Sequence, residues 1–118
     1  MDQISQLHDR IIRFRDARDW KQFHNPKDLG ISLMLEVAEL IEHFQWKTPE
    51  EIEQHLGKHR EDFEDEIADV LYYVLLIARD LDIDLAIAFD RKLSKNEAKY
   101  PEDKARGNHK KYNEYDAA

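Results

Sequence analysis

The sequence predicts an all-α fold, a small bundle of four to five helices. Only three glycines and three prolines occur in 118 residues, and no segment keeps the alternation of apolar and polar residues that is typical of a strand. Apolar residues instead recur at helical spacing. A chain of this length usually forms one domain with a thin core, so a partner subunit is a reasonable expectation.

The first helix is expected from Gln3 to about Arg18, because its apolar side chains recur at helical spacing. The segment DWKQFHNP then interrupts the pattern. Asn25 is a suitable N-cap for a second helix, Pro26 suits its first position, and Asp28 complements the helix dipole. We expect this second helix to run to about Gln45.

The third helix repeats the same start signal in TPEE. Thr48 caps the helix, Pro49 occupies its first position, and Glu51 closes a capping box. We expect this short helix to end near Gly57, because glycine is common at helix C-termini.

A fourth helix is expected from Arg60 to Leu81 and a fifth from the turn at Asp82–Asp84 to about Lys99. Pro101 favours an extended backbone at the residue before it and so ends the fifth helix. The expected apolar stripe of the fourth helix consists of Phe63, Ile67, Val70, Leu71, Val74, Ala78 and Leu81.

The segment from Glu102 onward has almost no aliphatic residues. A segment that cannot bury apolar surface does not form a packed core. We therefore expect one helical domain over residues 1–101 and a mobile polar tail over residues 102–118.

Charge and composition exclude several classes of protein. The formal charge of −8 argues against a general nucleic-acid binder, although a bound divalent metal can reverse the local field and admit a nucleotide. The absence of cysteine excludes disulfides and thiolate chemistry. The N-terminus lacks the features of a signal peptide, and the longest apolar stretch, Val70–Ala78, is too short to span a bilayer. We expect an intracellular, cytoplasmic protein.

Two stretches thirty residues apart follow the same pattern. EVAELIEHF begins at Glu36 and EIADVLYYV begins at Glu66, and both place acids three residues apart beside an apolar stripe. On a helix such acids share one edge. If the second and fourth helices pack through these stripes, their four acids meet at a common seam: Glu36, Glu39, Glu66 and Asp69.

Four carboxylates at one place do not all stay ionised without a cation. Ligands that are all oxygen suit a hard ion, so the pattern favours Mg²⁺, with Mn²⁺ as a possible substitute. The alternative is that these acids are solvated charges on helix edges. A di-iron site is disfavoured, because none of the six histidines has a glutamate three residues before it.

A carboxylate-bound Mg²⁺ typically recruits phosphate oxygens, and an exposed aromatic can stack on a base. Trp20, Phe23 and Trp46 flank the second helix, and each of them can equally pack in a core or at a subunit contact. Lys92 and Lys99 lie on one stripe of the fifth helix and could meet phosphate, although such a stripe alone is usually a solvated face.

These motifs resemble a known family. EVAEL followed by EIADVLYY is similar to the ExxE…ExxD signature of the all-α MazG-like nucleotide pyrophosphohydrolases. RDWKQFHNPKDLGISLMLEVAELIEHFQW resembles the corresponding segment of the dCTP pyrophosphatase branch. RKLSKNEAKYP resembles the family's motif on the fifth helix. The likeness covers roughly Ile4 to Pro101.

The resemblance implies a bundle that assembles as a dimer or as a tetramer of two dimers. It implies Mg²⁺-dependent hydrolysis of a nucleoside triphosphate between the α and β phosphates, with four acids as catalytic residues and metal ligands: Glu36, Glu39, Glu66 and Asp69. The implied substrate-binding residues are Trp20, Phe23, His24, Trp46, Tyr73, Lys92, Asn96 and Lys99. For the group that activates the attacking water, we favour Glu39.

The function expected is therefore removal of deoxynucleoside triphosphates, dCTP or modified cytosine forms, in nucleotide-pool house-cleaning. Two alternatives remain open at this stage. One is an enzyme of the same superfamily that acts on dUTP or phosphoribosyl-ATP. The other is a non-catalytic helical oligomerisation module.

Overall fold

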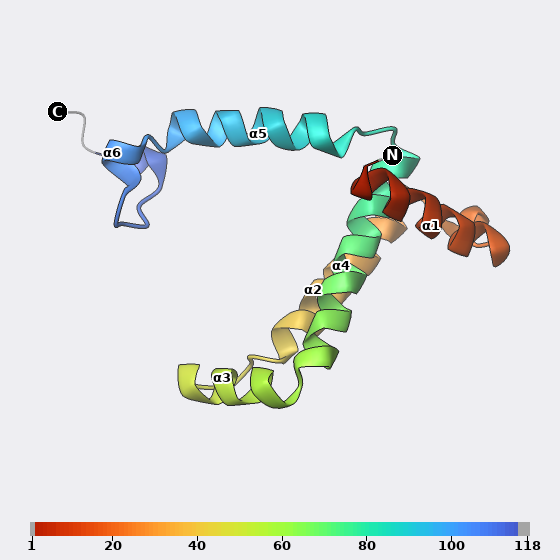
Figure 1. Ribbon diagram of the computed structural model, residues 1–118, viewed down its shortest axis with the longest axis horizontal. Coiled ribbons are helices and arrows are strands. Elements are labelled where there is room, and N and C mark those ends of the chain that lie inside the picture. The colour runs from red at the N-terminus through yellow and green to blue at the C-terminus, as the bar shows by residue number, and fades with distance from the viewer. Residues whose placement is uncertain (1, 116–118) are drawn as a thin grey trace. The chain divides into compact units, whose positions relative to one another are not determined.

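The computed structural model describes residues 2–115, and every regular element within that range is helical (Figure 1). The predicted all-α fold is therefore confirmed. The elements are α1 (Gln3–Ala17), a 3-10 turn (Lys21–Phe23), α2 (Pro26–Glu42), α3 (Pro49–Lys58), α4 (Arg60–Asp80), α5 (Leu85–Lys99), α6 (Glu102–Ala105) and a second 3-10 turn (Tyr112–Glu114). They fall into two compact units, one ending at Asp82 and one beginning at Ile83.

The predicted helix starts are confirmed by their caps. The Asn25 side chain accepts a hydrogen bond from the amide of Asp28 at 2.9 Å. Thr48 and Glu51 form a complete capping box at the start of α3. The local sequence determines these starts, because a capping side chain bonds only to the first turn of its own helix.

One predicted helix end is wrong, and another differs from the structure by one residue. The helix α2 stops at Glu42 rather than Gln45, because the chain tightens into i→i−3 hydrogen bonds and reaches a left-handed backbone at Trp46, with φ of 66°. Gly57 does not follow α3. The helix continues through it to Lys58 and is capped by His59, whose amide donates to the carbonyl of His55 at 2.8 Å.

The first unit is organised around α4, against which α1, α2 and α3 all pack. Its most extensive contact is with α2, which runs alongside it in the opposite direction (Figure 1). The most deeply buried apolar side chains of this unit are Leu29 in α2 and Leu75, Leu76 and Ala78 in α4. The core therefore lies at the C-terminal half of α4.

The predicted apolar stripe of α4 is only partly buried. Ala78 belongs to the core, whereas Ile67, Leu71 and Leu81 are exposed, and the buried Leu75 and Leu76 were not part of the stripe. The cause is that this helix is apolar on more than one side, so periodicity alone does not select the inward side.

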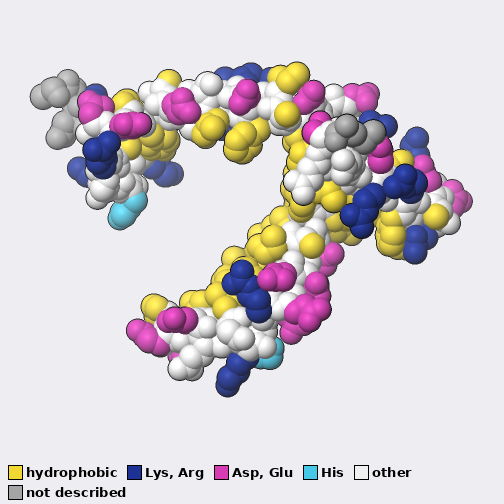
Figure 2. Space-filling view, viewed as in Figure 1, with side chains coloured by type: hydrophobic (Ala, Val, Ile, Leu, Met, Phe, Trp, Pro, Cys, Tyr) yellow, Lys and Arg dark blue, Asp and Glu magenta, His cyan; other side chains and the backbone are white. Residues whose placement is uncertain are grey.

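A second apolar face lies on α2. Leu29 faces the core, while apolar side chains elsewhere around the helix remain open to solvent along the α2–α4 pair (Figure 2). A helix that is apolar all round is normally covered on all sides. The exposed α2 face consists of Ile31, Met34, Leu35, Val37 and Ile41.

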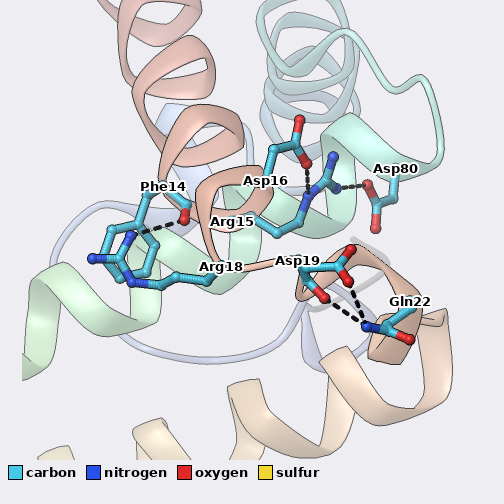
Figure 3. A network of polar contacts seen from close by, with 7 residues as sticks. All are labelled: Phe14, Arg15, Asp16, Arg18, Asp19, Gln22 and Asp80. Atoms are coloured by element: carbon cyan, nitrogen blue, oxygen red, sulfur yellow. Dashed lines mark hydrogen bonds and ion pairs between the residues drawn. The ribbon is translucent and has the colours of Figure 1, made fainter.

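Arg15 joins α1 to the end of α4 (Figure 3). Its side chain is buried and contacts two acids, Asp16 at 3.0 Å through Nε and Asp80 at 2.8 Å through Nη1. The chain then turns at Asp19, whose φ is 54°, and the amide of Trp20 donates to the Arg15 carbonyl at 3.2 Å. This turn fixes the backbone at Trp20.

The second unit contains α5, α6 and the second 3-10 turn. Tyr100 packs edge-on against Tyr112 and Tyr115, with ring centroids 6.2 and 6.1 Å apart. Short helices thus occur within the expected tail, whose mobility stays a prediction, and residues 116–118 lie outside the described range. Among the helices of residues 2–115, none combines the length and apolar character required to cross a membrane.

Candidate functional site

A pocket of about 530 Å³ opens in the first unit. Its walls come from α1, α2 and α4 and from the segment between α1 and α2. It brings together five of the residues singled out from the sequence, which are Trp20, His24, Glu36, Asp69 and Tyr73. Arg10 and Phe14 of α1 also line it, although no motif in the sequence pointed to them as site residues.

One wall of the pocket is acidic. Glu36 comes from α2 and Asp69 from α4, so the packing of these two helices carries both acidic motifs to one place. Burial raises the pKa of Glu36, and the neighbouring charges of Asp69, Glu39 and Glu66 raise it further. The four carboxyl groups of the two motifs therefore lie close enough to interact along the α2–α4 seam.

The donor atoms at this wall suit a hard cation. Among residues 2–115, no three histidine or acidic side chains are already gathered closely enough to hold an ion. However, Oε2 of Glu36 is buried and has no hydrogen-bond partner in the described part of the chain. A buried carboxylate oxygen without a partner is costly, and an ion would satisfy it. Oxygen donors of this kind are those that Mg²⁺ prefers.

Another wall of the pocket is aromatic. Trp20 packs edge-on against Phe14, with ring centroids 5.7 Å apart, and remains 42% exposed. Tyr72 contacts both Phe14 and Tyr73. Nδ1 of His24 is buried without a hydrogen-bond partner among the described residues. An exposed ring face beside an unpaired imidazole nitrogen can stack on a planar ligand and bind a polar edge of it.

Arg10 contributes a permanent positive charge to the pocket. No ion pair or hydrogen bond engages its side chain within residues 2–115. An unpaired guanidinium facing a cavity is suited to bind the oxygens of an anion, since it offers several donors in a planar arrangement.

The other residues selected from the sequence do not line this pocket. Phe23 is exposed, and Trp46 is 91% exposed. Lys92, Asn96 and Lys99 belong to α5 in the second unit, where the Lys99 ammonium lies 4.9 Å from the centre of the Tyr112 ring. Their role in binding a nucleotide stays a prediction.

The carboxylate of Glu66 lies in close contact with a histidine. Nε2 of His43 lies 2.5 Å from Oε2 of Glu66, and Nδ1 of His43 lies 2.7 Å from Nε2 of His55. No motif in the sequence pointed to either histidine. The signal was weak, because His43 and His55 are twelve residues apart and belong to the ends of different helices.

A MazG-like family model matches residues 31–115, which include both acidic motifs. The chain belongs to the MazG-like family. The resemblance expected from the motifs is therefore confirmed.

Two mammalian relatives are similar to nearly the whole of this chain. The chain is 37% identical to the human (Homo sapiens) dCTP pyrophosphatase 1 over 116 residues, and 37% identical to that of Rattus norvegicus over 114 residues. These alignments cover 97% and 95% of this chain but 66% and 65% of the relatives, so the chain spans just under two thirds of their length.

The fold has a counterpart among solved structures. A crystal structure of a pyrophosphatase from Archaeoglobus fulgidus superposes with a TM-score of 0.80 at 41% sequence identity. The match covers 86% of this chain and 94% of the archaeal one, so the two share nearly the whole helical fold.

Proposed function

We propose that the protein is a Mg²⁺-dependent nucleoside triphosphate pyrophosphohydrolase. It converts a deoxynucleoside triphosphate, dCTP or a modified cytosine form, to the monophosphate and pyrophosphate. The observation that carries this proposal is the pocket itself, because Glu36 and Asp69 line the same cavity as Trp20. Such a pocket suits a ligand with a metal-bound phosphate end and a planar base end.

The residues proposed to hold the metal are the four acids of the two motifs, Glu36, Glu39, Glu66 and Asp69. Their support is the buried, unpartnered oxygen of Glu36 and the combined effect of the other three on its pKa. When bound, Mg²⁺ would offset phosphate charge and make a water molecule more acidic.

Side chains of the protein itself would handle the proton of the attacking water and bind the substrate. Glu39 is exposed beside Glu36, and we assign it the role of accepting the proton of the attacking water. The water oxygen bonds to the α-phosphorus, the bond between this phosphorus and the bridging oxygen breaks, and pyrophosphate leaves. Trp20 and His24 hold the base, while Arg10 binds phosphate oxygens.

The proposal includes a homo-oligomer, a dimer or a tetramer of two dimers, in the cytoplasm. Its support is the exposed α2 face, which a second copy of the chain would cover by packing helix against helix. A neighbouring protomer is then a possible source of the Trp46 and α5 side chains that do not line the pocket of this chain.

The test is a panel of nucleotides incubated with the protein and Mg²⁺, with the products resolved by ion-exchange chromatography. Release of monophosphate and pyrophosphate from dCTP is expected. Diphosphate plus orthophosphate would contradict the assigned bond. The variant Asp69→Asn should lose turnover about 100-fold or more while remaining helical, because it removes a metal ligand. Asp65→Asn, an exposed acid of the same helix, is the matched control.

The same panel separates the alternatives. If dUTP or phosphoribosyl-ATP is the preferred substrate, the proposed pyrophosphohydrolase reaction stands, but the assignment of cytosine as the preferred base is wrong. A non-catalytic module would show no turnover and no rise in melting temperature with Mg²⁺ plus nucleotide, since only a ligand that binds the folded state raises stability.

A further inference from the structure

Two histidines form a continuous contact to one of the proposed metal ligands. The His43 ring lies between His55 and Glu66, with 2.7 Å from its Nδ1 to His55 Nε2 and 2.5 Å from its Nε2 to Glu66 Oε2. The His43 side chain is 11% exposed and that of Glu66 is 24% exposed. The contact is therefore largely shielded from the solvent that weakens surface ion pairs.

Packing fixes the plane of the His43 ring. Phe63 of α4 meets it edge-on, with centroids 5.7 Å apart and planes at 89°, and His55 packs against it at 4.9 Å. His55 is held in turn by the ring of His59, at 4.6 Å. An imidazole with neighbours on several sides and both nitrogens engaged has little freedom to rotate.

Oε2 of Glu66 makes no hydrogen bond within the described residues, so the 2.5 Å contact with Nε2 of His43 is the polar contact that it has there. A protonated Nε2 attracts the carboxylate oxygen. Nδ1 of His43 and Nε2 of His55 share a hydrogen bond in which the tautomers of the two rings decide which nitrogen donates. These contacts connect α3 through His43 to the carboxylate on α4.

We propose that His43, held by His55, is a positioning residue that orients the Glu66 carboxylate for metal binding. This inference rests on the proposed function, because it takes Glu66 as a ligand. His43 engages Oε2 and leaves Oε1 as the oxygen available to an ion. Ligands held by such outer contacts bind metal more tightly than free ones, since less side-chain freedom is lost on binding.

The alternative is that the two histidines only tie α3 to the α2–α4 pair. In that case removing the imidazole changes stability but leaves metal affinity unchanged. Metal affinity in the absence of nucleotide is therefore the measurement that separates the two roles, and it does not depend on turnover.

The experiment measures Mn²⁺ binding to the nucleotide-free protein by electron paramagnetic resonance of the free ion. His43→Leu should raise the Kd for Mn²⁺ by about 10- to 100-fold. His43→Gln places an amide donor near the position of Nε2 and should restore most of the affinity. His55→Leu should weaken binding to a smaller extent. His109→Leu, which removes an exposed imidazole of the second unit, is the matched control.

Equal Mn²⁺ affinity in wild type and His43→Leu would overturn the inference alone. Absence of Mn²⁺ binding in the wild type would overturn the proposed metal site as well. Circular dichroism without metal identifies any variant that fails to fold. If His43→Leu does not fold, the Mn²⁺ affinities of His43→Gln and His55→Leu are compared with that of wild type. The proposal is contradicted if His55→Leu keeps the wild-type affinity while His43→Gln loses it.

Discussion

Arg15 in α1 and Asp80 in α4 form an ion pair across 65 positions of sequence, with 2.8 Å between Nη1 and Oδ1 (Figure 3). The arginine is only 4% exposed. A charge removed from water in this way depends on its partners, because little solvent is available to replace them. The pair attaches α1, and with it the Arg10 and Phe14 side of the pocket, to the central helix.

Replacing Asp80 by Asn should therefore destabilise the protein. The buried guanidinium loses its shortest charged contact but keeps Asp16, so we expect a loss of about 1.5–3 kcal/mol, typical of a hydrogen bond to a charged group. Urea unfolding followed by circular dichroism measures this. Asp16→Asn is the control, with an expected loss of about 0–1 kcal/mol because the Asp16 side chain is 54% exposed. Equal losses would contradict this account of the pair.

Glu36 should make the metal-free protein less stable as pH rises. Its pKa in the folded protein is raised above the ordinary value of 4.5, by burial first and then by Asp69 and Glu39. The folded state thus binds this proton more tightly than the unfolded state does. The resulting stability is fully present below pH 4.5 and is lost as pH rises through the raised pKa.

Glu36→Gln removes this pH dependence, since an amide does not ionise. Without metal, the variant should melt at a higher temperature than wild type at pH 7 and show a smaller difference at pH 4. Added Mg²⁺ should raise the melting temperature of wild type more than that of the variant. Glu53→Gln, an exposed position in α3, controls for the substitution itself. An identical pH profile for Glu36→Gln and wild type would contradict the prediction.

Nucleotide binding should be visible through Trp20. The chain has two tryptophans, so Trp46→Phe leaves Trp20 as the sole indole reporter. Because Trp20 lines the pocket, dCTP should quench the fluorescence of this variant. Trp20→Ala should weaken binding by about 1–3 kcal/mol, the usual contribution of base stacking. A Trp46→Phe protein that turns over dCTP but shows no fluorescence change would exclude Trp20 as the stacking ring.

Arg10 should contribute to recognition of phosphate. Arg10→Ala is expected to raise the KM for the triphosphate by about 10-fold or more, because a charge-assisted contact is lost. The affinity for the monophosphate product should fall less. Arg13→Ala removes an exposed arginine of the same helix that does not line the pocket, and steady-state kinetics should show it unchanged. Similar effects of the two substitutions would point to general charge rather than a specific contact.

The exposed α2 face should mediate self-association. Met34→Glu and Ile41→Glu place charges on it and should shift the protein toward monomers in sedimentation velocity. Lys27→Glu, an exposed charge reversal near the start of the same helix, should leave the assembly unchanged. An assembly that survives both charged substitutions would place the subunit contact elsewhere.

The local features of this fold were readable in the sequence. Asn25 and Thr48 cap their helices as expected, because each bonds within the first turn of its own helix. Helical spacing also put the paired acids on one edge of each helix, and the packing of α2 on α4 brings Glu36 and Asp69 into one pocket. These inferences needed only the period of the helix and the chemistry of the side chains.

Features that depend on tertiary packing were not predictable. Periodicity could not select the buried side of α4, where Leu75 and Leu76 are inward and Ile67 is outward. Arg15 appeared to be an ordinary charge on an amphipathic helix, and only the fold brings Asp80 to it. The spacing of apolar residues likewise could not indicate that α1 forms a wall of the pocket.

Two properties of Trp46 contribute nothing to the stability of the fold: its backbone is left-handed and its ring is almost fully exposed. A non-glycine residue in that conformation costs about 1–2 kcal/mol. Selection for heat resistance alone should therefore replace Trp46 with glycine or asparagine, whereas selection that also demands catalysis should retain an aromatic ring. The two outcomes of such directed evolution would reveal how much stability the protein gives up at this one position.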